Sequence, residues 1–271
     1  MPLRSTTSAA EGTLWPTPVT RPTTVIFPLL IGLLACKHPV EAPTEMDELT
    51  RYLLREFEAE DPAGLMVGLD NLRPLLAEAP DEGWSLTAPN LEDLGDLQPP
   101  EGLDPGDAQG LAVVYDSPHP VADHVALMLL EDLTPVSPTA ETYARSFTEG
   151  QDCFEDGGCE FLRTVNEIYR SNLLMSMGFT LYEDYRWVGD AVLSRNWIAE
   201  SAHGDEASNH LWQDWEIEVW LPTDEGGTLR LWAMWTQAEY AGISEEMAEV
   251  SGRAGLVSAM ETQDELIAGG R

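Results

Sequence analysis

The segment LWQDWEIEVWL, residues 211–221, alternates between acidic and apolar side chains from residue 214 to residue 219. One face of this strand carries apolar side chains: Trp215, Ile217, Val219 and Leu221. The other face carries three carboxylates: Asp214, Glu216 and Glu218. A register shift of one residue would bury the carboxylates, so the pairing register is firmly set and the carboxylates are expected to face away from the core.

Strand signals extend outward from this segment in both directions. The turn 224–227 leads into a second strand over 228–240, which has apolar bulk on both faces and is therefore expected to be covered on each side. Two earlier strands, 179–188 and 191–201, meet at the turn Gly189-Asp190. After the strands, apolar residues at helical spacing predict a long final helix over 244–267.

The elements expected before these strands, over residues 111–173, have weaker sequence signals. Residues 111–115 predict a short strand, and the apolar run 125–130 fits either a central strand or a buried helix. Ser137-Pro138 predicts the start of a helix that ends near Thr148. The apolar spacing from Phe161 to Leu173 predicts a second helix.

The predicted order is thus two strands, two helices, four antiparallel strands and a long C-terminal helix. This order resembles the helix-grip arrangement of START-like (SRPBCC) domains, in which a curved antiparallel sheet wraps the final helix around an apolar cavity. The predicted fold class is α+β, a curved antiparallel sheet packed on a long C-terminal helix and preceded by an N-terminal helical hairpin. An ordinary α+β sandwich with a filled core predicts the same pattern.

We expect five segments along the chain. Residues 1–35 form a signal peptide, 36–44 a lipidated tether, 45–79 a helical hairpin, 80–110 an acidic irregular linker, and 111–271 the α+β domain. Two short helices alone bury too little surface to be stable, so the hairpin is expected to pack on something else.

The signal peptide is predicted from an apolar run that ends at a cysteine. Residues 25–35 are too few to span a bilayer, and Arg21 precedes them, as in a secretory signal. Leu33-Leu34-Ala35-Cys36 resembles the lipobox of bacterial lipoproteins, which implies a lipid attached to Cys36. Residues 1–18 fit a signal poorly, so translation starts at either Met1 or Val19.

The resemblance to lipoproteins also implies a location. The protein is expected in the cell envelope, anchored to a membrane through its N-terminal lipid. Lys37 follows the cysteine where aspartate would retain an enteric lipoprotein in the inner membrane. This favours an outer-membrane lipoprotein that faces the periplasm or the cell surface.

The net charge of −34 restricts the partners. Nucleic-acid binders need clustered Lys and Arg, so we expect no nucleic-acid partner. The charge is explained by solubility through mutual repulsion, with a basic protein partner or divalent cations as alternatives.

Cysteines and histidines offer two short motifs. Cys153 and Cys159 are expected to form a disulfide in an exported protein; two thiols alone do not complete a zinc shell. His203 and His210 flank a loop rich in metal-binding residue types, but the spacing matches no known ligand pattern. A solvated loop is the default there, a metal site is the alternative, and we predict no metal or other cofactor.

Most of the tryptophans fall in the four late strands, where their rings either fill the core or line a cavity for a lipid or another apolar ligand. On the cavity interpretation, four candidate ligand-binding residues are Arg195, Trp197, Trp215 and Trp235. Arg186 and Arg195 either bind an anionic group of the ligand or form an ion pair with a neighbouring acidic residue. In a chain this acidic, the ion pair is the more common outcome. The neighbours considered are Glu183, Asp184 and Glu200.

Catalytic motifs are lacking in the sequence. There is no Gly-x-Ser-x-Gly elbow, phosphate loop or dinucleotide fingerprint, so no catalytic residue is assigned. The first hypothesis is a non-enzymatic envelope lipoprotein that binds an apolar ligand or lipid. The second is an envelope interaction protein with a solid core and an acidic partner-binding surface, and the third is a hydrolase or cyclase-like enzyme.

Overall fold

The hairpin of β8 (His210–Pro222) and β9 (Thr228–Glu239) lies at the centre of the sheet. This computed structural model describes residues 40–80, 83–137, 139–171, 176–205, 209–240 and 242–270. Trp215 pairs with Trp235 and Glu216 with Met234 across the hairpin. The predicted strands 211–221 and 228–240 are therefore confirmed, including their antiparallel pairing.

Around this hairpin the described residues form a nine-stranded antiparallel sheet. The strand order is β1-β2-β9-β8-β6-β5-β4-β3, and β7 pairs with β8. The remaining strands are β1 (Trp84–Leu86), β2 (Gln109–Ser117), β3 (Ala140–Glu149), β4 (Phe161–Ser171), β5 (Ser176–Val188), β6 (Ala191–Trp197) and β7 (Ala202–His203).

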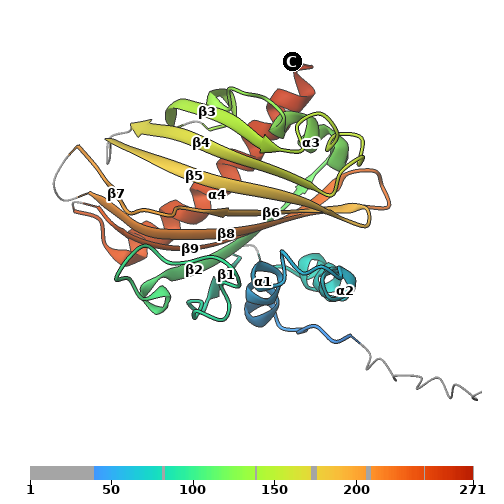
Figure 1. Ribbon diagram of the computed structural model, residues 1–271, viewed down its shortest axis with the longest axis horizontal. Helices are drawn as coiled ribbons and strands as arrows, with labels where there is room; N and C mark the ends of the chain where they lie inside the picture. Colours follow the sequence, from blue (N-terminus) through green and yellow to red (C-terminus); the bar gives the residue numbers. More distant parts are fainter. Residues whose placement is uncertain are drawn as a thin grey trace, which may run out of the picture. The chain divides into compact units, whose positions relative to one another are not determined.

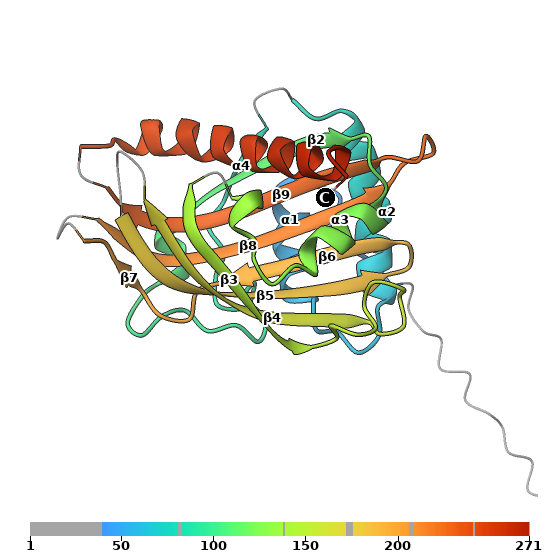
Figure 2. The same cartoon turned by 90° about the horizontal axis from the view of Figure 1, so that it is seen from above.

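Helices cover both faces of the sheet. The helices are α1 (Met46–Arg55), α2 (Ala63–Ala77), α3 (Val121–Met128) and α4 (Glu245–Ala268), with 3₁₀ turns η1 (Pro105–Asp107) and η2 (Thr134–Val136). The sheet curves around α4, while α1 and α2 lie on its other side (Figures 1 and 2). We call the face toward α3 and α4 the inner face and the face toward α1 and α2 the outer face. The predicted α+β fold class is confirmed.

Two predicted helices are wrong. The segments predicted as helices from 137 and from 161 are the strands β3 and β4, paired along their length. In β4 the buried residues alternate, and they include the polar Thr164 and Asn166. A pattern read from apolar residues alone misses this period of two. The run 125–130, for which a strand and a helix were both open, falls largely in α3.

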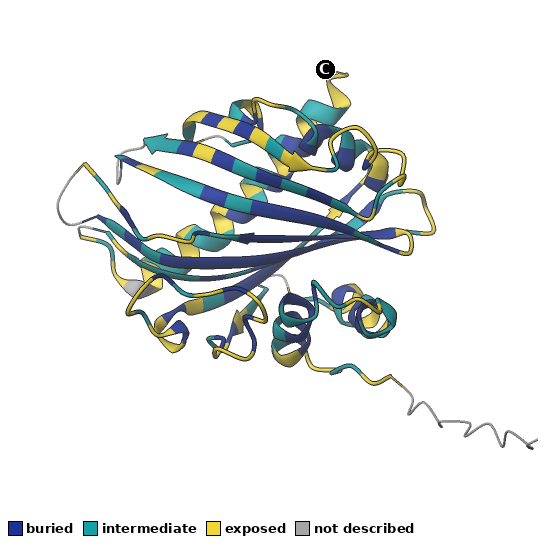
Figure 3. Cartoon of the chain, viewed as in Figure 1, coloured by how far each residue is buried: buried dark blue, intermediate teal, exposed yellow. Residues whose placement is uncertain are grey.

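The outer face packs against the N-terminal helices. Leu49, Leu53 and Phe57 are fully buried in one core cluster with the apolar face of β8. The segment between α2 and β2 joins this core through Leu94 and Leu97, which are buried although the segment is mostly irregular. Figure 3 shows nearly continuous burial along β6 and β8. The covering on both sides explains why both faces of these two strands exclude water.

The inner face packs against α4. Leu256 and Met260 of the helix cluster with Leu111 and Val113 of β2. Gly252 brings the helix close to the sheet, because a Cβ there would lie 3.2 Å from Leu111 Cδ2. The helix matches the predicted range 244–267, and the Ser244 hydroxyl caps it by accepting from the Met247 N–H.

Candidate functional site

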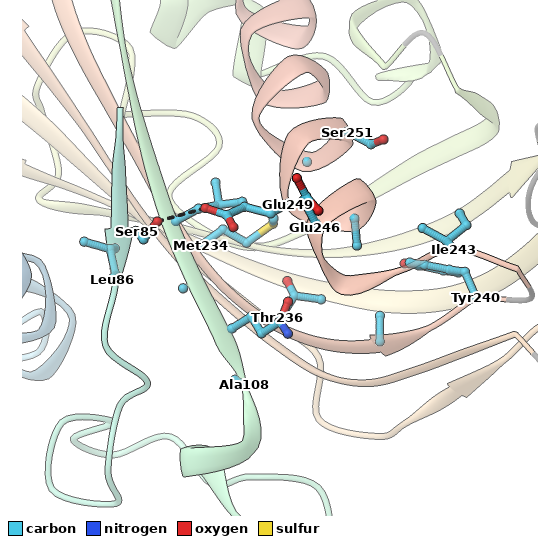
Figure 4. A pocket seen from close by; sticks show the side chains of 16 residues that line it. Ser85, Leu86, Ala108, Met234, Thr236, Tyr240, Ile243, Glu246, Glu249 and Ser251 are labelled. Atoms are coloured by element: carbon cyan, nitrogen blue, oxygen red, sulfur yellow. Dashed lines mark hydrogen bonds between the residues drawn. The ribbon is translucent and has the colours of Figure 1, made fainter. Parts of the chain in front are cut away.

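A groove of about 690 Å³ lies between the first half of α4 and the sheet. Its floor is the inner face of β2 and β9, where Leu111 and Met234 are neighbours in register. Ala248 and Gly252 of α4 line its other wall. Leu86 of β1 closes one side, and Figure 4 shows the groove from close by. These residues give the groove an apolar floor and wall, and polar residues such as Thr236 and Glu249 complete the lining.

On the side of the groove where β1 meets α4, hydrogen bonds between polar side chains hold the helix to the strand. The Ser85 hydroxyl donates to Glu249 Oε1 at 2.8 Å, the bond drawn in Figure 4. Arg253 Nη2 donates to the same oxygen at 2.8 Å and to Ser85 Oγ at 3.0 Å. The hydrogen bonds from Arg253 and Ser85 lower the pKa of Glu249. A charged carboxylate therefore ties α4 to the edge of the sheet at neutral pH.

A buried carboxyl group lies next to the groove on the other side. Thr236 lines the groove, and its hydroxyl donates a hydrogen bond to Asp214. Tyr240 lines the groove as well; its pKa is raised by burial and by the charge of Asp214. A polar group of a ligand that reached Thr236 and Tyr240 would thus approach Asp214.

Asp214 is the first of three buried carboxyl groups on β8. Asp214, Glu216 and Glu218 are 7%, 8% and 6% exposed, so the expectation that they face away from the core is wrong. The register itself is as predicted, with the tryptophan and aliphatic side chains on the opposite face. The carboxyl groups are buried because α3 and α4 form a second covering layer. The alternation in the sequence identifies this row, but only the covering helices make it internal.

Donors on β8 itself and on the neighbouring strands β6 and β9 satisfy the second and third of these carboxyl groups. Glu216 Oε2 accepts from Asn196 Nδ2 at 2.9 Å and from Trp232 Nε1 at 3.0 Å. Glu218 Oε2 accepts from Trp220 Nε1 at 2.8 Å and from Arg230 Nη2 at 3.2 Å. Hydrogen-bonded partners offset the cost of removing such groups from water.

A second polar cluster lies farther along the inner face. Arg145 of β3 forms a buried ion pair with Glu183 of β5. Tyr143 Oη donates to Glu183 Oε1 at 3.0 Å, and Asn166 Nδ2 donates to Oε2 at 3.1 Å. Tyr185 Oη lies 3.2 Å from Arg145 Nη2. The cluster spans β3, β4 and β5, so it ties the edge of the sheet to its middle.

A small cavity of about 70 Å³ lies beneath the second half of α4, between these two polar groups of residues. Glu183, Glu218 and Tyr143 line it together with Gln263 of α4. Gln263 Oε1 is buried without a protein partner within the described part of the chain. The lining is mixed, with Met128, Leu133 and Leu181 beside these polar groups. A water molecule bound at the polar groups would satisfy that oxygen.

Burial changes the titration of the carboxyl row. It is the largest cause of the raised pKa values of Asp214, to about 6, and Glu216, to about 8. For Glu216, the negative charge of Asp214 adds to the effect, so the two groups titrate as a pair. In the folded protein the pair therefore holds a proton at neutral pH. The same two groups would both be ionised in water.

Ser117, His124 and Asp264 meet at the junction of β2, α3 and α4. The Ser117 hydroxyl donates to Asp264 Oδ1 at 2.7 Å, and His124 Nε2 lies 3.0 Å from Ser117 Oγ. Burial and the positive charge of Arg230 lower the pKa of His124 to about 3, so its ring is neutral. The serine sits between the other two residues, unlike a catalytic triad, in which the histidine does. No local pattern in the sequence reveals this cluster, because Asp264 lies 147 residues beyond Ser117.

The four predicted ligand-binding residues lie away from the groove. Trp215 and Trp235 are fully buried on the outer face, where Trp235 Nε1 donates to the Thr87 carbonyl at 3.0 Å. Trp197, on the same face, stacks on Tyr182 with ring centroids 5.3 Å apart. None of these rings lines the groove. The structure brings them together with one another in the core beneath α1.

Arg195 is buried on the outer face, and its guanidinium is held by three acidic groups. Nη2 lies 2.9 Å from Glu58 Oε1 and 3.0 Å from Asp184 Oδ2, and Nη1 lies 2.6 Å from Asp96 Oδ1. The predicted pairing with Asp184 is confirmed. Arg186 pairs instead with Glu160, a residue outside the set considered from the sequence.

The remaining sequence motifs fall in different places. Cys153 and Cys159 form the expected disulfide, with Cα atoms 5.4 Å apart. Cys36 and the segment 1–35 lie outside the described residues. Among the described residues, no group of three or more His, Cys, Asp or Glu is placed to hold a metal ion. No helix in the described ranges is both long enough and apolar enough to cross a bilayer.

Comparisons with known proteins concern the fold alone. No protein-family model and no curated protein matches the sequence. Solved structures with a similar backbone include a STAR-related lipid transfer protein from Xanthomonas axonopodis, at 10% identity and a TM-score of 0.44, covering 62% of this chain and 89% of that one. A START superfamily protein from Mycobacterium smegmatis has 10% identity and a TM-score of 0.40, covering 60% and 99%. The Zhui aromatase/cyclase from Streptomyces sp. R1128 has 12% identity and a TM-score of 0.41, covering 59% and 94%.

Proposed function

We propose that this protein binds an apolar ligand, a lipid or a comparable small molecule, in the groove beneath the first half of α4. The observation that carries the proposal is the groove itself, about 690 Å³ in volume and lined by Leu86, Leu111, Met234 and Ile243. Pockets that bind small molecules are typically about 300–1,000 Å³ and predominantly apolar. A few polar groups at fixed places then set the orientation of the ligand.

The polar groups of the groove favour one orientation. Leu111 and Met234 line its apolar floor, whereas Thr236 and Tyr240 adjoin the buried Asp214. An amphiphilic ligand would therefore place its apolar part over Met234 and a hydrogen-bonding group near Thr236. The Thr236 hydroxyl donates to Asp214, so its remaining lone pair favours a ligand group that donates a hydrogen bond.

We also propose that the protein works on an envelope membrane, anchored by a lipid on Cys36. Residues 25–35 and the sequence Leu33-Leu34-Ala35-Cys36 support this reading. One acyl chain holds a protein only weakly, and two or three hold it firmly, at about 0.8 kcal/mol for each buried methylene. Labelling with palmitate, with Cys36→Ser as the control, tests the anchor. An unlabelled wild-type product would contradict it.

Ligand binding is tested with a variant in which a larger side chain on α4 fills part of the groove. Ala248→Phe adds a ring where Ala248 faces the groove, whereas Val250→Phe adds the same ring at a position that is 65% exposed on the same helix. Native mass spectrometry of the protein purified from its membrane should show a bound small molecule in the wild type and in Val250→Phe. Ala248→Phe should lose it while remaining folded by circular dichroism.

Two results would contradict the ligand proposal. One is a wild-type protein without ligand after mild purification and after incubation with extracted membrane lipids. The other is equal occupancy in the two phenylalanine variants. An empty wild-type protein would favour the second hypothesis, an envelope protein that meets a partner through its acidic surface.

A further inference from the structure

Two histidines face each other at one end of the sheet. His203 ends β7 and pairs directly with His210, the first residue of β8. Their Nδ1 atoms are 2.8 Å apart, and the pair lies at the surface of the molecule. The Gly204 N–H donates to the Asn209 carbonyl at 2.8 Å, so the backbone next to the pair is also held across the hairpin.

A tryptophan fixes the orientation of both rings. His210 stacks on Trp212 with ring centroids 4.4 Å apart and an interplanar angle of 25°. His203 meets the edge of Trp212 at 5.7 Å and stands nearly perpendicular to His210, at 85°. Two rings held in this way need little reorganisation to bind a common ligand, which lowers the entropic cost of binding.

The chemistry of two converging imidazole nitrogens is that of a transition-metal ligand. Imidazole binds Zn²⁺, Cu²⁺ and Ni²⁺ through a ring nitrogen that carries no proton. Without a metal, one Nδ1 must donate its proton to the other across the 2.8 Å contact. Metal binding through both Nδ1 atoms requires that proton to move to Nε2 of its own ring, with no net change in the charge of the rings.

The general order of affinities distinguishes between metals. A site of nitrogen and oxygen donors binds Cu²⁺ more tightly than Ni²⁺ or Zn²⁺. The 2.8 Å between the two Nδ1 atoms is a hydrogen-bond distance, and it places both nitrogens within reach of one ion that replaces the shared proton.

We propose that His203 and His210 form a two-histidine surface site for a divalent transition-metal ion, with Cu²⁺ preferred over Zn²⁺. The described residues supply no third ligand, since no group of three or more metal-ligating side chains is placed together there. Water would complete the coordination shell. The site is separate from the groove, because neither histidine lines it.

The full-length protein is titrated with Cu²⁺ and with Zn²⁺ near neutral pH, in a buffer with a weak competing chelator. Electron paramagnetic resonance of the Cu²⁺ form should show hyperfine coupling to two ring nitrogens. His203→Ala and His210→Ala should each bind Cu²⁺ about tenfold or more weakly and lose the two-nitrogen signal. His119→Ala, which removes a histidine elsewhere, should bind like the wild type.

The expected order is Cu²⁺ tighter than Zn²⁺ by about tenfold or more. Equal Cu²⁺ affinity in the wild type and His203→Ala would overturn the site, as would a spectrum with oxygen ligands only. Circular dichroism of each variant checks that the sheet is intact, because His203 and His210 are exposed or half-buried and their loss should not unfold it.

Discussion

Asn196 Nδ2 donates a hydrogen bond of 2.9 Å to Glu216 Oε2 across the pair of strands β6 and β8, beneath α4. The two residues are 2% and 8% exposed. A carboxyl group in this position is removed from water on both sides and touches a neutral amide instead of a cation. The bond exemplifies the inner face of this sheet, where polar residues take positions that an apolar core would otherwise fill.

The buried pair Asp214 and Glu216 predicts that stability falls as pH rises. Their folded-state pKa values, raised to about 6 and about 8, mean that the folded protein holds more protons than the unfolded chain between about pH 4 and pH 8. The free energy of unfolding therefore decreases across this window, by up to about 1.4 kcal/mol per pH unit for one group. Each of the two carboxyl groups makes its full contribution to the free energy of unfolding below its pKa in the unfolded chain. This contribution is lost as the pH rises above its pKa in the folded protein.

The variant Glu216→Gln separates the pH dependence caused by the buried carboxyl groups from that caused by repulsion among the many surface carboxylates. The amide oxygen still accepts from Asn196 and Trp232, but it no longer titrates. Urea unfolding from pH 5 to pH 9 should give a flatter pH dependence for this variant than for the wild type. Asp224→Asn, at an exposed turn, should keep the wild-type slope. A wild-type slope in Glu216→Gln would show that the carboxyl row does not carry the effect.

The buried ion pair of Arg145 and Glu183 predicts a large loss of stability when one partner is removed. Arg145→Met leaves Glu183 buried without its cation and should lower the free energy of unfolding by about 3–5 kcal/mol. Asp190→Ala removes one partner of an exposed pair and should cost less than about 1 kcal/mol. Denaturant unfolding of both variants measures the difference. A loss below about 1 kcal/mol for Arg145→Met would mean that the remaining donors to Glu183 suffice.

Arg195 distinguishes a structural role from ligand binding. Glu58 lies in the segment after α1, and Asp96 lies in the segment between α2 and β2. Arg195 ties both segments to the sheet, where Asp184 is its third partner, so Arg195→Met should lower the melting temperature. Occupancy of the groove, measured by native mass spectrometry, should stay unchanged. Loss of ligand from a folded Arg195→Met protein would instead support the prediction made from the sequence that Arg195 contacts the ligand.

The disulfide predicts a moderate contribution to stability. It closes a short loop between β3 and β4, and the chain-entropy model gives about 2 kcal/mol for such a loop. Adding a reductant should therefore lower the melting temperature of the wild type by several degrees. The double variant Cys153→Ser and Cys159→Ser should melt at the lower temperature and be insensitive to the reductant. An unchanged wild-type melting curve after complete reduction would contradict this assignment.

Local sequence signals predicted the late strands and the final helix well. Acidic and apolar residues alternate in β8, glycine turns bound the hairpins, and a helical repeat follows, so each element is recognisable without its neighbours. In β3 and β4 the same reasoning was wrong. Arg145, Thr164 and Asn166 are buried there, and an apolar pattern does not count polar residues as core. A β-strand that buries polar side chains resembles a helix or a loop in the sequence.

The sequence by itself determined the α+β class, the register of β8 and the pairing of the cysteines. These follow from the alternation and spacing of residues along the chain, which are local properties. For Arg195 it offered Asp184 as one of three acidic neighbours, and the structure selected among them. Only the tertiary structure decided which face of the sheet borders the groove, and therefore that Trp215 and Trp235 fill the outer core while Thr236 adjoins the groove. It also decided that the carboxylates of β8 are internal. The physical reason is that burial depends on what covers a face, and the covering helices come from both ends of the chain.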